Sequence, residues 1–229
     1  MRERVSVRVK VKICGITRRE DALRAAEIGA DFIGFVFCKS PRQVTAEAAR
    51  AIGEELPPWV LRVGVFMDQP AEEIEEIVRF CRLDLVQLHG QESPAFCQRF
   101  GSSCIKAVTV RSPADLADLG QWRVPYVLLD APKEGKREEA AARLKSRAFN
   151  WEWAKELEEK RRRRDFPRLF LAGGLNADNV GEAIGLFRPF AVDVASGIEA
   201  APGVKDYSKM KAFVEEVRRY SGEERDEHC

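Results

Sequence analysis

Histidine is scarce in this sequence, which holds only His89 and His228 among its 229 residues. A histidine-rich metal site and an H-E-x-x-H zinc helix are therefore excluded. The strings G-x-S-x-G, G-x-x-x-x-G-K-[ST] and G-x-G-x-x-G are also absent, which removes the common hydrolase, P-loop and dinucleotide motifs. Any chemistry must use Cys, Asp, Glu, Lys, Arg or a single internal histidine, and we expect no metal.

The chain also lacks an excess of charge of one sign, because 38 Lys and Arg face 37 Asp and Glu, a net charge of +1. Proteins that bind nucleic acids usually show a basic excess, so we expect no nucleic-acid partner. Residues 169–177 form the longest stretch without a charge, far short of the roughly 20 apolar residues that span a bilayer. Charges also interrupt the first twelve residues, which argues against a signal peptide. We therefore expect no membrane contact and a cytoplasmic protein.

Cysteine is present but is not paired in the sequence. The six cysteines lie at positions 14, 38, 81, 97, 104 and 229, without any C-x-x-C pair. A chain of this length does not depend on disulfides for a core, so reduced thiols are expected. Cys38, Cys81, Cys97 and Cys104 are predicted to be packing residues.

Short β-branched runs alternate with segments of helical periodicity, which is the pattern of βα units around a parallel sheet. Eight strands are predicted to end near positions 14, 37, 67, 88, 108, 130, 172 and 194. Helices are predicted at about 19–28, 45–55, 70–80, 93–100, 113–119, 151–161, 176–186 and 207–219, with Thr45, Ser93 and Asn176 as start signals. This order and length predict an α/β fold, a single (β/α)8 TIM barrel, with an open doubly wound sheet as the alternative.

The sixth unit is unusually long, because 42 residues separate its strand end from the next, against 20 to 30 elsewhere. Its extra segment, 131–148, reads APKEGKREEAAARLKSRA and favours helix or disorder. Lys160 to Arg164 follow as five consecutive positive charges, which we interpret as a solvated helix end rather than a nucleic-acid patch. We expect one domain over 1–229, with its core at about 10–219 and a charged tail at 221–229.

Glycines follow the seventh and eighth predicted strands, where barrels often bind phosphate. Gly173 and Gly174 follow one strand, and Ser196 and Gly197 follow the next. Backbone N–H groups at such turns bind anions without lysine. The alternative is that these glycines only form tight turns.

Cys14 and Asp130 end the first and sixth predicted strands, so they would face each other across the mouth of the barrel. A thiol acts as a base when a cation lowers its pKa, and a carboxyl acts as an acid when burial raises its pKa. A buried cysteine and a loop-capping aspartate remain equally compatible with these positions. Gln87 and His89, near the end of the fourth strand, are either ligand contacts or structural residues.

Several strings along the chain together resemble phosphoribosylanthranilate isomerase. They are KICGIT at 12–17, FVF at 35–37 followed by SPR at 40–42, VGVF at 63–66, VQLHG at 86–90, LLD at 128–130, AGGLN at 172–176 and VDVASGIE at 192–199. The resemblance covers about 10–219 in the right order. It implies a (β/α)8 barrel of tryptophan biosynthesis that catalyses an Amadori rearrangement of N-(5-phosphoribosyl)anthranilate, without a cofactor.

Site residues carry over from this resemblance motif by motif. The family's catalytic base matches Cys14 and its general acid matches Asp130. Arg42 matches the residue that pairs with the anthranilate carboxylate. The pocket would be lined by Gln87, His89 and Asp193, and the phosphate would be held by Gly173, Gly174, Ser196 and Gly197. The implied partner is a phosphorylated small molecule, and the sequence fits either a monomer or a homodimer.

The chain departs from the family pattern after the sixth strand. A glycine-rich stretch and F-D-W are usual there, whereas this chain has the charged insert and Phe149-Asn150-Trp151. Two other functions stay open from the sequence: a barrel isomerase acting on another phosphoribosyl amine, such as an aminoaldose of histidine synthesis, and a non-catalytic phosphate-ligand binding barrel.

Overall fold

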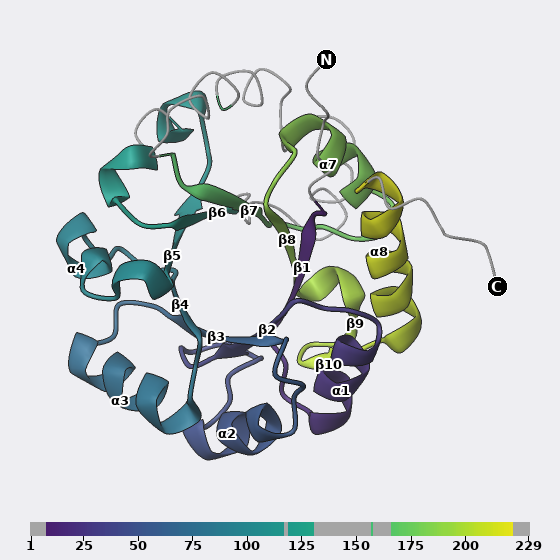
Figure 1. The fold of residues 1–229 in the computed structure, drawn as a ribbon, viewed down its shortest axis with the longest axis horizontal. Coiled ribbons are helices and arrows are strands. Elements are labelled where there is room, and N and C mark those ends of the chain that lie inside the picture. Colours follow the sequence, from purple (N-terminus) through teal and green to yellow (C-terminus); the bar gives the residue numbers. More distant parts are fainter. Residues whose placement is uncertain (1–7, 117–118, 131–156, 158–165, 222–229) are drawn as a thin grey trace.

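The computed structural model describes residues 8–116, 119–130, 157 and 166–221. Eight parallel strands close into a barrel in which each strand pairs with the next and β8 pairs with β1. The strands are β1 (Lys10–Cys14), β2 (Phe32–Val36), β3 (Leu61–Phe66), β4 (Leu85–Leu88), β5 (Cys104–Thr109), β6 (Tyr126–Asp130), β7 (Arg168–Leu171) and β8 (Ala191–Val194). The ring of strands and the helices outside it are visible in Figure 1. The prediction of a (β/α)8 barrel is confirmed, and the open sheet is excluded.

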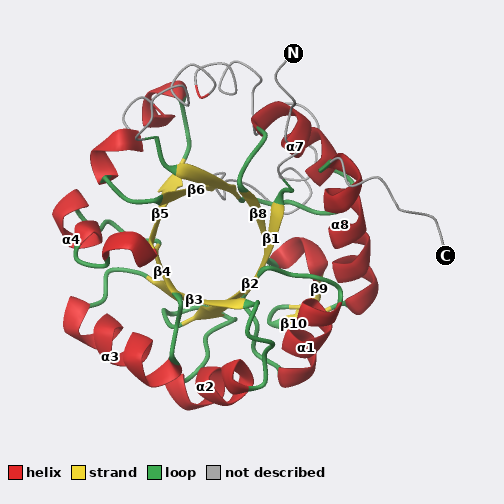
Figure 2. Ribbon diagram, in the orientation of Figure 1, coloured by secondary structure: helices red, strands yellow, loops and turns green. Residues whose placement is uncertain are grey.

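Helices connect the strands on the outside of the barrel, as the colours of Figure 2 show. They are α1 (Arg19–Glu27), α2 (Ala46–Glu54), α3 (Ala71–Cys81), α4 (Pro94–Gln98), α7 (Val180–Phe187) and α8 (Tyr207–Tyr220). Short 3-10 segments occur at η1 (Gly101–Ser103), η2 (Pro113–Leu116), η3 (Leu119–Trp122) and η4 (Ser196–Ile198). Among the described residues, no helix is both long and apolar enough to span a membrane.

Two of the three predicted helix caps are confirmed. The Thr45 hydroxyl accepts a hydrogen bond from the Ala48 N–H, and Ser93 accepts one from the Phe96 N–H. The prediction for Asn176 is wrong, because the helix begins only at Val180 with Asn179 at its N-cap.

Asn176 instead belongs to the loop after β7, where its N–H donates to the Asn179 Oδ1 at 2.9 Å. Short polar side chains form such local turns as readily as they start helices, so the pattern alone did not separate the two.

Two further helix predictions have different outcomes. The predicted helix at 113–119 is not found in its described residues, because 113–116 lie in one 3-10 turn and residue 119 begins another, at 119–122. The predicted helix at 151–161 and the insert at 131–148 lie outside the described residues, except for Leu157, which is helical and buried.

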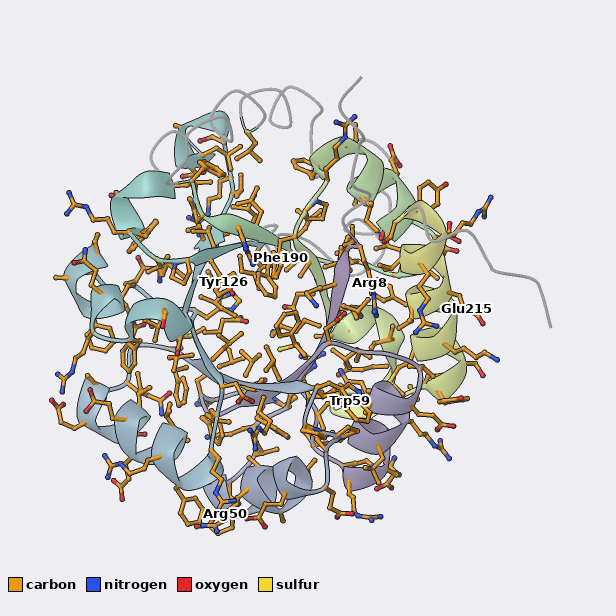
Figure 3. The ribbon with its side chains drawn as sticks, in the orientation of Figure 1. Arg8, Arg50, Trp59, Tyr126, Phe190 and Glu215 are labelled. Carbon is orange, nitrogen blue, oxygen red and sulfur yellow. The ribbon has the colours of Figure 1, made fainter. Side chains whose placement is uncertain are left out.

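Aromatic side chains fill the barrel at the amino ends of its strands. Phe170 makes edge contacts with Phe32, Tyr126 and Phe190, at centroid distances of 5.3, 5.7 and 5.7 Å. The labelled Tyr126 and Phe190 lie over the barrel interior in Figure 3. This apolar packing closes one end of the barrel, so polar chemistry is left to the carboxyl ends of the strands.

A short hairpin after β8 extends the carboxyl end of the barrel. Its strands are β9 (Glu199–Ala201) and β10 (Val204–Lys205), and they lie beside α1 and α8 in Figure 1. The Thr17 hydroxyl donates to the Gly203 carbonyl, and the Lys205 N–H donates to the Asp21 carboxylate at 3.0 Å. These bonds fix the hairpin against the loop that follows Cys14 and against the first turn of α1.

Candidate active site

Cys14 is the last residue of β1, and its side chain is 8% exposed. It packs with Val36 and Val65, which come from the ends of β2 and β3. Its register partner on β2 is Gly34, where an added Cβ would lie 2.8 Å from the Cys14 Sγ. Glycine at this position therefore makes the room that the thiol occupies.

Gly15, next along the chain, has a φ of +72°, in the left-handed region that favours glycine. A Cβ there would also lie 2.4 Å from the Arg42 Cδ. Gly15 thus turns the chain after Cys14 and lets the Arg42 side chain cross close to the end of β1.

Two buried lysines act on the Cys14 thiol. Lys12 lies two residues earlier on the same face of β1, and the Lys205 ammonium donates to the Cys14 carbonyl at 2.7 Å. Burial raises the pKa of Cys14 and the Asp193 charge adds to this, whereas the charges of Lys12 and Lys205 and a hydrogen bond from Lys12 lower it. The balance leaves the pKa of Cys14 above its ordinary value, so its thiolate forms toward alkaline pH.

Lys12 and Asp193 form an ion pair inside the barrel. They are register partners on β1 and β8, and the Lys12 Nζ lies 2.8 Å from the Asp193 Oδ1. The Lys12 side chain is fully buried. Burial alone would lower its pKa, but the charges and hydrogen bonds of Asp193 and Cys14 raise it, which keeps this lysine protonated.

Asp130 ends β6, and its carboxylate lies 3.2 Å from the His89 Nε2. The His89 Nδ1 in turn lies 3.0 Å from the Gln87 Nε2. Since an amide N–H can only donate, this arrangement assigns the ring proton to Nε2, which then donates to Asp130. The three side chains form one hydrogen-bonded row along the mouth, from β4 to β6.

The Gln87 Oε1 at the start of this row is buried and has no hydrogen-bond partner among the described residues. The structure thus brings Gln87, His89 and Asp130 together, as predicted residues of one pocket.

Arg42 makes a paired contact that the sequence did not predict. Its Nε and Nη2 donate to the two carboxylate oxygens of Glu199, at 2.7 and 2.6 Å. Burial raises the pKa of Glu199, but the contacts with Arg42 and Lys205 outweigh this and lower it. Among the described residues, the Nη1 group and one Nη2 hydrogen of Arg42 make no further hydrogen bond, because a guanidinium has five N–H donors and Glu199 takes two of them.

Glu199 and Lys205 connect the arginine to the end of β1. The Lys205 Nζ donates to the Glu199 Oε1 at 3.1 Å, besides its bonds to the carbonyls of Cys14 and Ala195. Burial lowers the pKa of Lys205, and the Glu199 contact partly restores it. The result is a continuous row of polar contacts from Arg42 through Glu199 and Lys205 to Cys14.

The loops after β7 and β8 pack against each other. Gly173 and Gly174 have φ values of +96° and +72°, so both need the freedom of glycine. A Cβ on Gly197 would lie 1.9 Å from the Leu175 carbonyl oxygen, so only glycine permits this contact between the two loops. Ser196 is exposed at the start of η4. The four residues predicted to bind phosphate therefore share one edge of the mouth.

Sequence reasoning assigned no role to Lys12, Glu199 or Lys205. A signal was present for Lys12, because lysine is almost never fully buried without a partner and here it falls two residues before Cys14 in a strand. Glu199 and Lys205 gave no such signal, since the fold of the hairpin brings them over β1. Among the described residues, no group of His, Cys, Asp and Glu could hold a metal ion.

Comparison with known proteins identifies the family. The family model of N-(5'phosphoribosyl)anthranilate (PRA) isomerase matches residues 11–216. The chain belongs to this family. An N-(5'-phosphoribosyl)anthranilate isomerase of Syntrophus aciditrophicus is 46% identical over 215 residues, covering 93% of this chain and 89% of the relative. That of Geobacter sp. is 46% identical over 213 residues, covering 93% and 99%.

Solved structures of the family have the same fold. Phosphoribosyl anthranilate isomerase of Thermotoga maritima superposes with a TM-score of 0.81 at 41% identity, covering 92% of this chain and 99% of that one. A phosphoribosyl anthranilate isomerase in complex with reduced 1-(o-carboxyphenylamino)-1-deoxyribulose 5-phosphate superposes with a TM-score of 0.78 at 41% identity, with the same coverage. Membership of the N-(5'-phosphoribosyl)anthranilate isomerase family makes this chain an isomerase of tryptophan biosynthesis.

Proposed function

We propose that Cys14 is the base and Asp130 the acid of the isomerisation that the family catalyses, the conversion of N-(5-phosphoribosyl)anthranilate to 1-(2-carboxyphenylamino)-1-deoxyribulose 5-phosphate. The observation that carries this assignment is their placement at one end of a closed barrel. They end β1 and β6, which β7 and β8 separate, so a substrate in the mouth would lie between them.

The reaction needs one proton delivered and one removed. Protonated Asp130 gives its proton to the furanose ring oxygen, and the C1–O bond breaks to leave a Schiff base with the anthranilate nitrogen. The Cys14 thiolate then removes the C2 proton, and the electron pair forms an enolamine. Tautomerisation of the enolamine gives the ketone, so no electrons enter or leave and no cofactor is needed.

His89 supports the acid in this scheme. Its Nε2 lies 3.2 Å from Asp130, so its N–H can stabilise the carboxylate after the proton has left. Gln87 holds the opposite ring nitrogen and thereby fixes the orientation of the ring. We therefore place both in support of Asp130.

The substrate's two anionic ends would bind at separate edges of the mouth. The remaining N–H groups of Arg42 would take the anthranilate carboxylate, with Glu199 holding the guanidinium plane in place. Backbone N–H groups at Gly173, Gly174, Ser196 and Gly197 would take the phosphate. Asp193 would line the floor of the pocket beside Lys12.

For the whole molecule, we propose a single barrel domain that works in the cytoplasm as a monomer or a homodimer. The closed barrel supports the first point, and a place in amino-acid biosynthesis supports the second. A related Thermotoga maritima structure is described as monomers generated from a dimeric enzyme. Light scattering during size-exclusion chromatography would decide between the two assemblies.

The test of the catalytic assignment is the fluorescence loss of N-(5-phosphoribosyl)anthranilate in the presence of the full-length protein. Cys14→Ser and Asp130→Asn are expected to lower kcat/KM by about 10²- to 10⁴-fold. Matched controls are Cys81→Ser, a buried position at the end of α3 where a hydroxyl can still donate to the Ala46 carbonyl, and Asp84→Asn, at the opposite end of the barrel.

Both control variants should stay within a few-fold of the parent protein. Parental kcat/KM in Cys14→Ser or Asp130→Asn would refute the roles proposed for them. An aminoaldose of histidine synthesis is the comparison substrate, and a higher kcat/KM on it would overturn the assignment to N-(5-phosphoribosyl)anthranilate.

A further inference from the structure

Lys12, the buried lysine below Cys14, takes no part in the proposed proton transfers. Lys12 is fully buried in the interior of a barrel whose other inward side chains are mostly apolar. An ammonium group in such a place costs free energy unless it is paired, and a hydrophobic pair of similar volume is often as stable or more stable. The pair of Lys12 and Asp193 is therefore poorly explained as a device for stability.

Position relates Lys12 to the thiol. Lys12 and Cys14 alternate with the outward-facing Val11 and Ile13, so both side chains point into the barrel with Cys14 one layer nearer the mouth. The positive charge of Lys12 lowers the pKa of Cys14. On the other side of Cys14, the Lys205 ammonium binds its carbonyl oxygen at 2.7 Å.

We propose that Lys12 is a positioning residue whose ammonium group stabilises the Cys14 thiolate that removes the substrate proton, with Lys205 as a second cation on the other side of Cys14. The inference deepens the proposed function, because it rests on Cys14 being the base. Asp193 has two effects. It keeps Lys12 charged and fixed in place, and its own negative charge disfavours the thiolate form of Cys14.

The charges around Cys14 support this arrangement. The charged groups that face it are Lys12 on β1, Asp193 on β8, Lys205 on β10, and Arg42 with its partner Glu199. Among these described residues, three cations face two carboxylates. Before substrate binds, one positive charge is left over, and a Cys14 thiolate would balance it.

Burial disfavours the ionisation of the Cys14 thiol, and the charge of Lys12 counteracts this effect. Cys14 is 8% exposed and surrounded by Val36 and Val65, so water solvates its anion poorly. Without a cation beside it, the pKa of a thiol in such a place would rise further above its ordinary value. Lys12 supplies that cation from below Cys14, on the side away from the mouth of the barrel where substrate binds.

The test is the rate at which iodoacetamide alkylates Cys14 as a function of pH in the full-length protein. Mass spectrometry of the peptide that contains Cys14 separates its reaction from that of the other cysteines. Lys12→Met should raise the apparent pKa of Cys14 by about one unit or more, with about a tenfold lower alkylation rate at pH 8. Asp193→Asn should shift the pKa in the opposite direction, because it removes a negative charge near the thiol.

Lys106→Met is the matched control. Lys106 is also a buried lysine in a barrel strand, paired with Glu92 at 2.6 Å, but it does not act on Cys14. It should change the stability of the protein and leave the pKa of Cys14 unaltered. A merely structural role for Lys12 would make the two lysine variants behave alike and would not give Asp193→Asn a shift of opposite sign.

Two results would overturn the proposal: an unchanged Cys14 pKa in Lys12→Met, or an equal rise in Lys106→Met. If Lys12→Met does not fold, Lys12→Met/Asp193→Asn removes both charges, and its Cys14 pKa must still exceed that of Asp193→Asn. Alkylation needs no turnover, so the proposed function is judged separately. A normal kcat/KM in Cys14→Ser would refute the base, whereas an unshifted thiol with an inactive Cys14→Ser would refute only the role of Lys12.

Discussion

At the scale of single residues, the groups around the Cys14 thiol have opposing effects on its pKa. Burial and Asp193 raise the pKa of Cys14, and Lys12 and Lys205 lower it. The thiolate therefore forms less readily than that of a free cysteine but far more readily than that of an isolated buried one. A base with a high pKa is a strong one once it has formed, which suits the removal of a proton from carbon.

Arg42 gives the first prediction at this scale. Replacing it by Lys keeps the charge but loses the planar fork that binds two oxygens of Glu199 and presents the remaining N–H groups to substrate. We expect Arg42→Lys to raise KM by the equivalent of about 1 to 3 kcal/mol, with a smaller change in kcat. Steady-state kinetics measure both. An unchanged KM and kcat/KM would remove Arg42 from the site.

Gly34 gives the second prediction. An added Cβ would lie 2.8 Å from the Cys14 Sγ and 3.1 Å from its Cα, so Gly34→Ala must displace the thiol. Overpacking of this kind costs about 1 to 3 kcal/mol, and we expect kcat/KM to fall by about tenfold or more. Activity and thermal unfolding of the purified variant give the two readouts. Full activity in a stably folded Gly34→Ala would show that the position of the thiol is not critical.

The sequence indicated this residue level only in part. It singled out Cys14, Asp130, Arg42, Gln87 and His89, and the structure places all of them at the carboxyl ends of the strands or in the loops that follow. It did not indicate that Arg42 binds Glu199, because the two are 157 positions apart and only the closed barrel with its hairpin brings them together. Long-range pairs of charges are set by topology rather than by local pattern.

At the scale of secondary structure elements, strands were predicted better than helix starts. Every predicted strand end falls within one residue of an observed end, because a buried parallel strand is an apolar run bounded by turns. Helix starts depend on which of several polar residues caps the first turn. Asn176 and Asn179 both fit, and hydrogen bonding within the loop decides for Asn179.

Helix α7 gives the prediction at this scale. Gly185 lies in it with helical φ, is exposed, and has open space around an added Cβ. Glycine in a helix interior is less favourable than alanine by about 0.5 to 1 kcal/mol, so Gly185→Ala should stabilise the protein by that amount. Denaturant unfolding measures it, and kcat/KM should not change. A loss of stability would indicate that α7 needs the glycine for packing.

At the scale of the whole molecule, the barrel separates stability from chemistry. The aromatic side chains around Phe170 close the amino end of the barrel, while the ion pairs of Lys12 with Asp193 and of Lys205 with Glu199 lie toward the carboxyl end. The periodicity of eight βα units predicted this division before any site residue was known. The charged insert at 131–148, which stands where the family has a glycine-rich stretch, lies outside the described residues.

The stability of the whole fold in acid should depend on the buried ion pair of Glu92 and Lys106. Burial raises the pKa of Glu92, but Lys106 and backbone N–H groups outweigh burial and leave that pKa below its ordinary value. A carboxylate of this kind stabilises the protein above its unfolded pKa, near 4.3, and the stabilisation is lost as pH falls through the folded pKa. The melting temperature should therefore drop steeply below about pH 4.

The variant Glu92→Gln tests this source of acid sensitivity. It leaves Lys106 buried without its charge partner, so it should cost about 3 to 5 kcal/mol at pH 7 and show a flatter fall of the melting temperature in acid. Glu215→Gln, at an exposed position on α8, is the control and should keep the parental pH profile. An acid limb in Glu92→Gln as steep as that of the parent would assign the sensitivity to other carboxylates.

The central claim is that the Cys14 thiolate is the base, and the pH dependence of kcat/KM tests it most directly. Since kcat/KM reports the groups of the free enzyme, one limb of its pH profile should have the same apparent pKa as the alkylation of Cys14, above the ordinary thiol value of about 8.5. In Lys12→Met, both values should move upward together. A kcat/KM profile without a limb at the alkylation pKa of Cys14, or with a limb that stays in place while that pKa moves, would contradict the account.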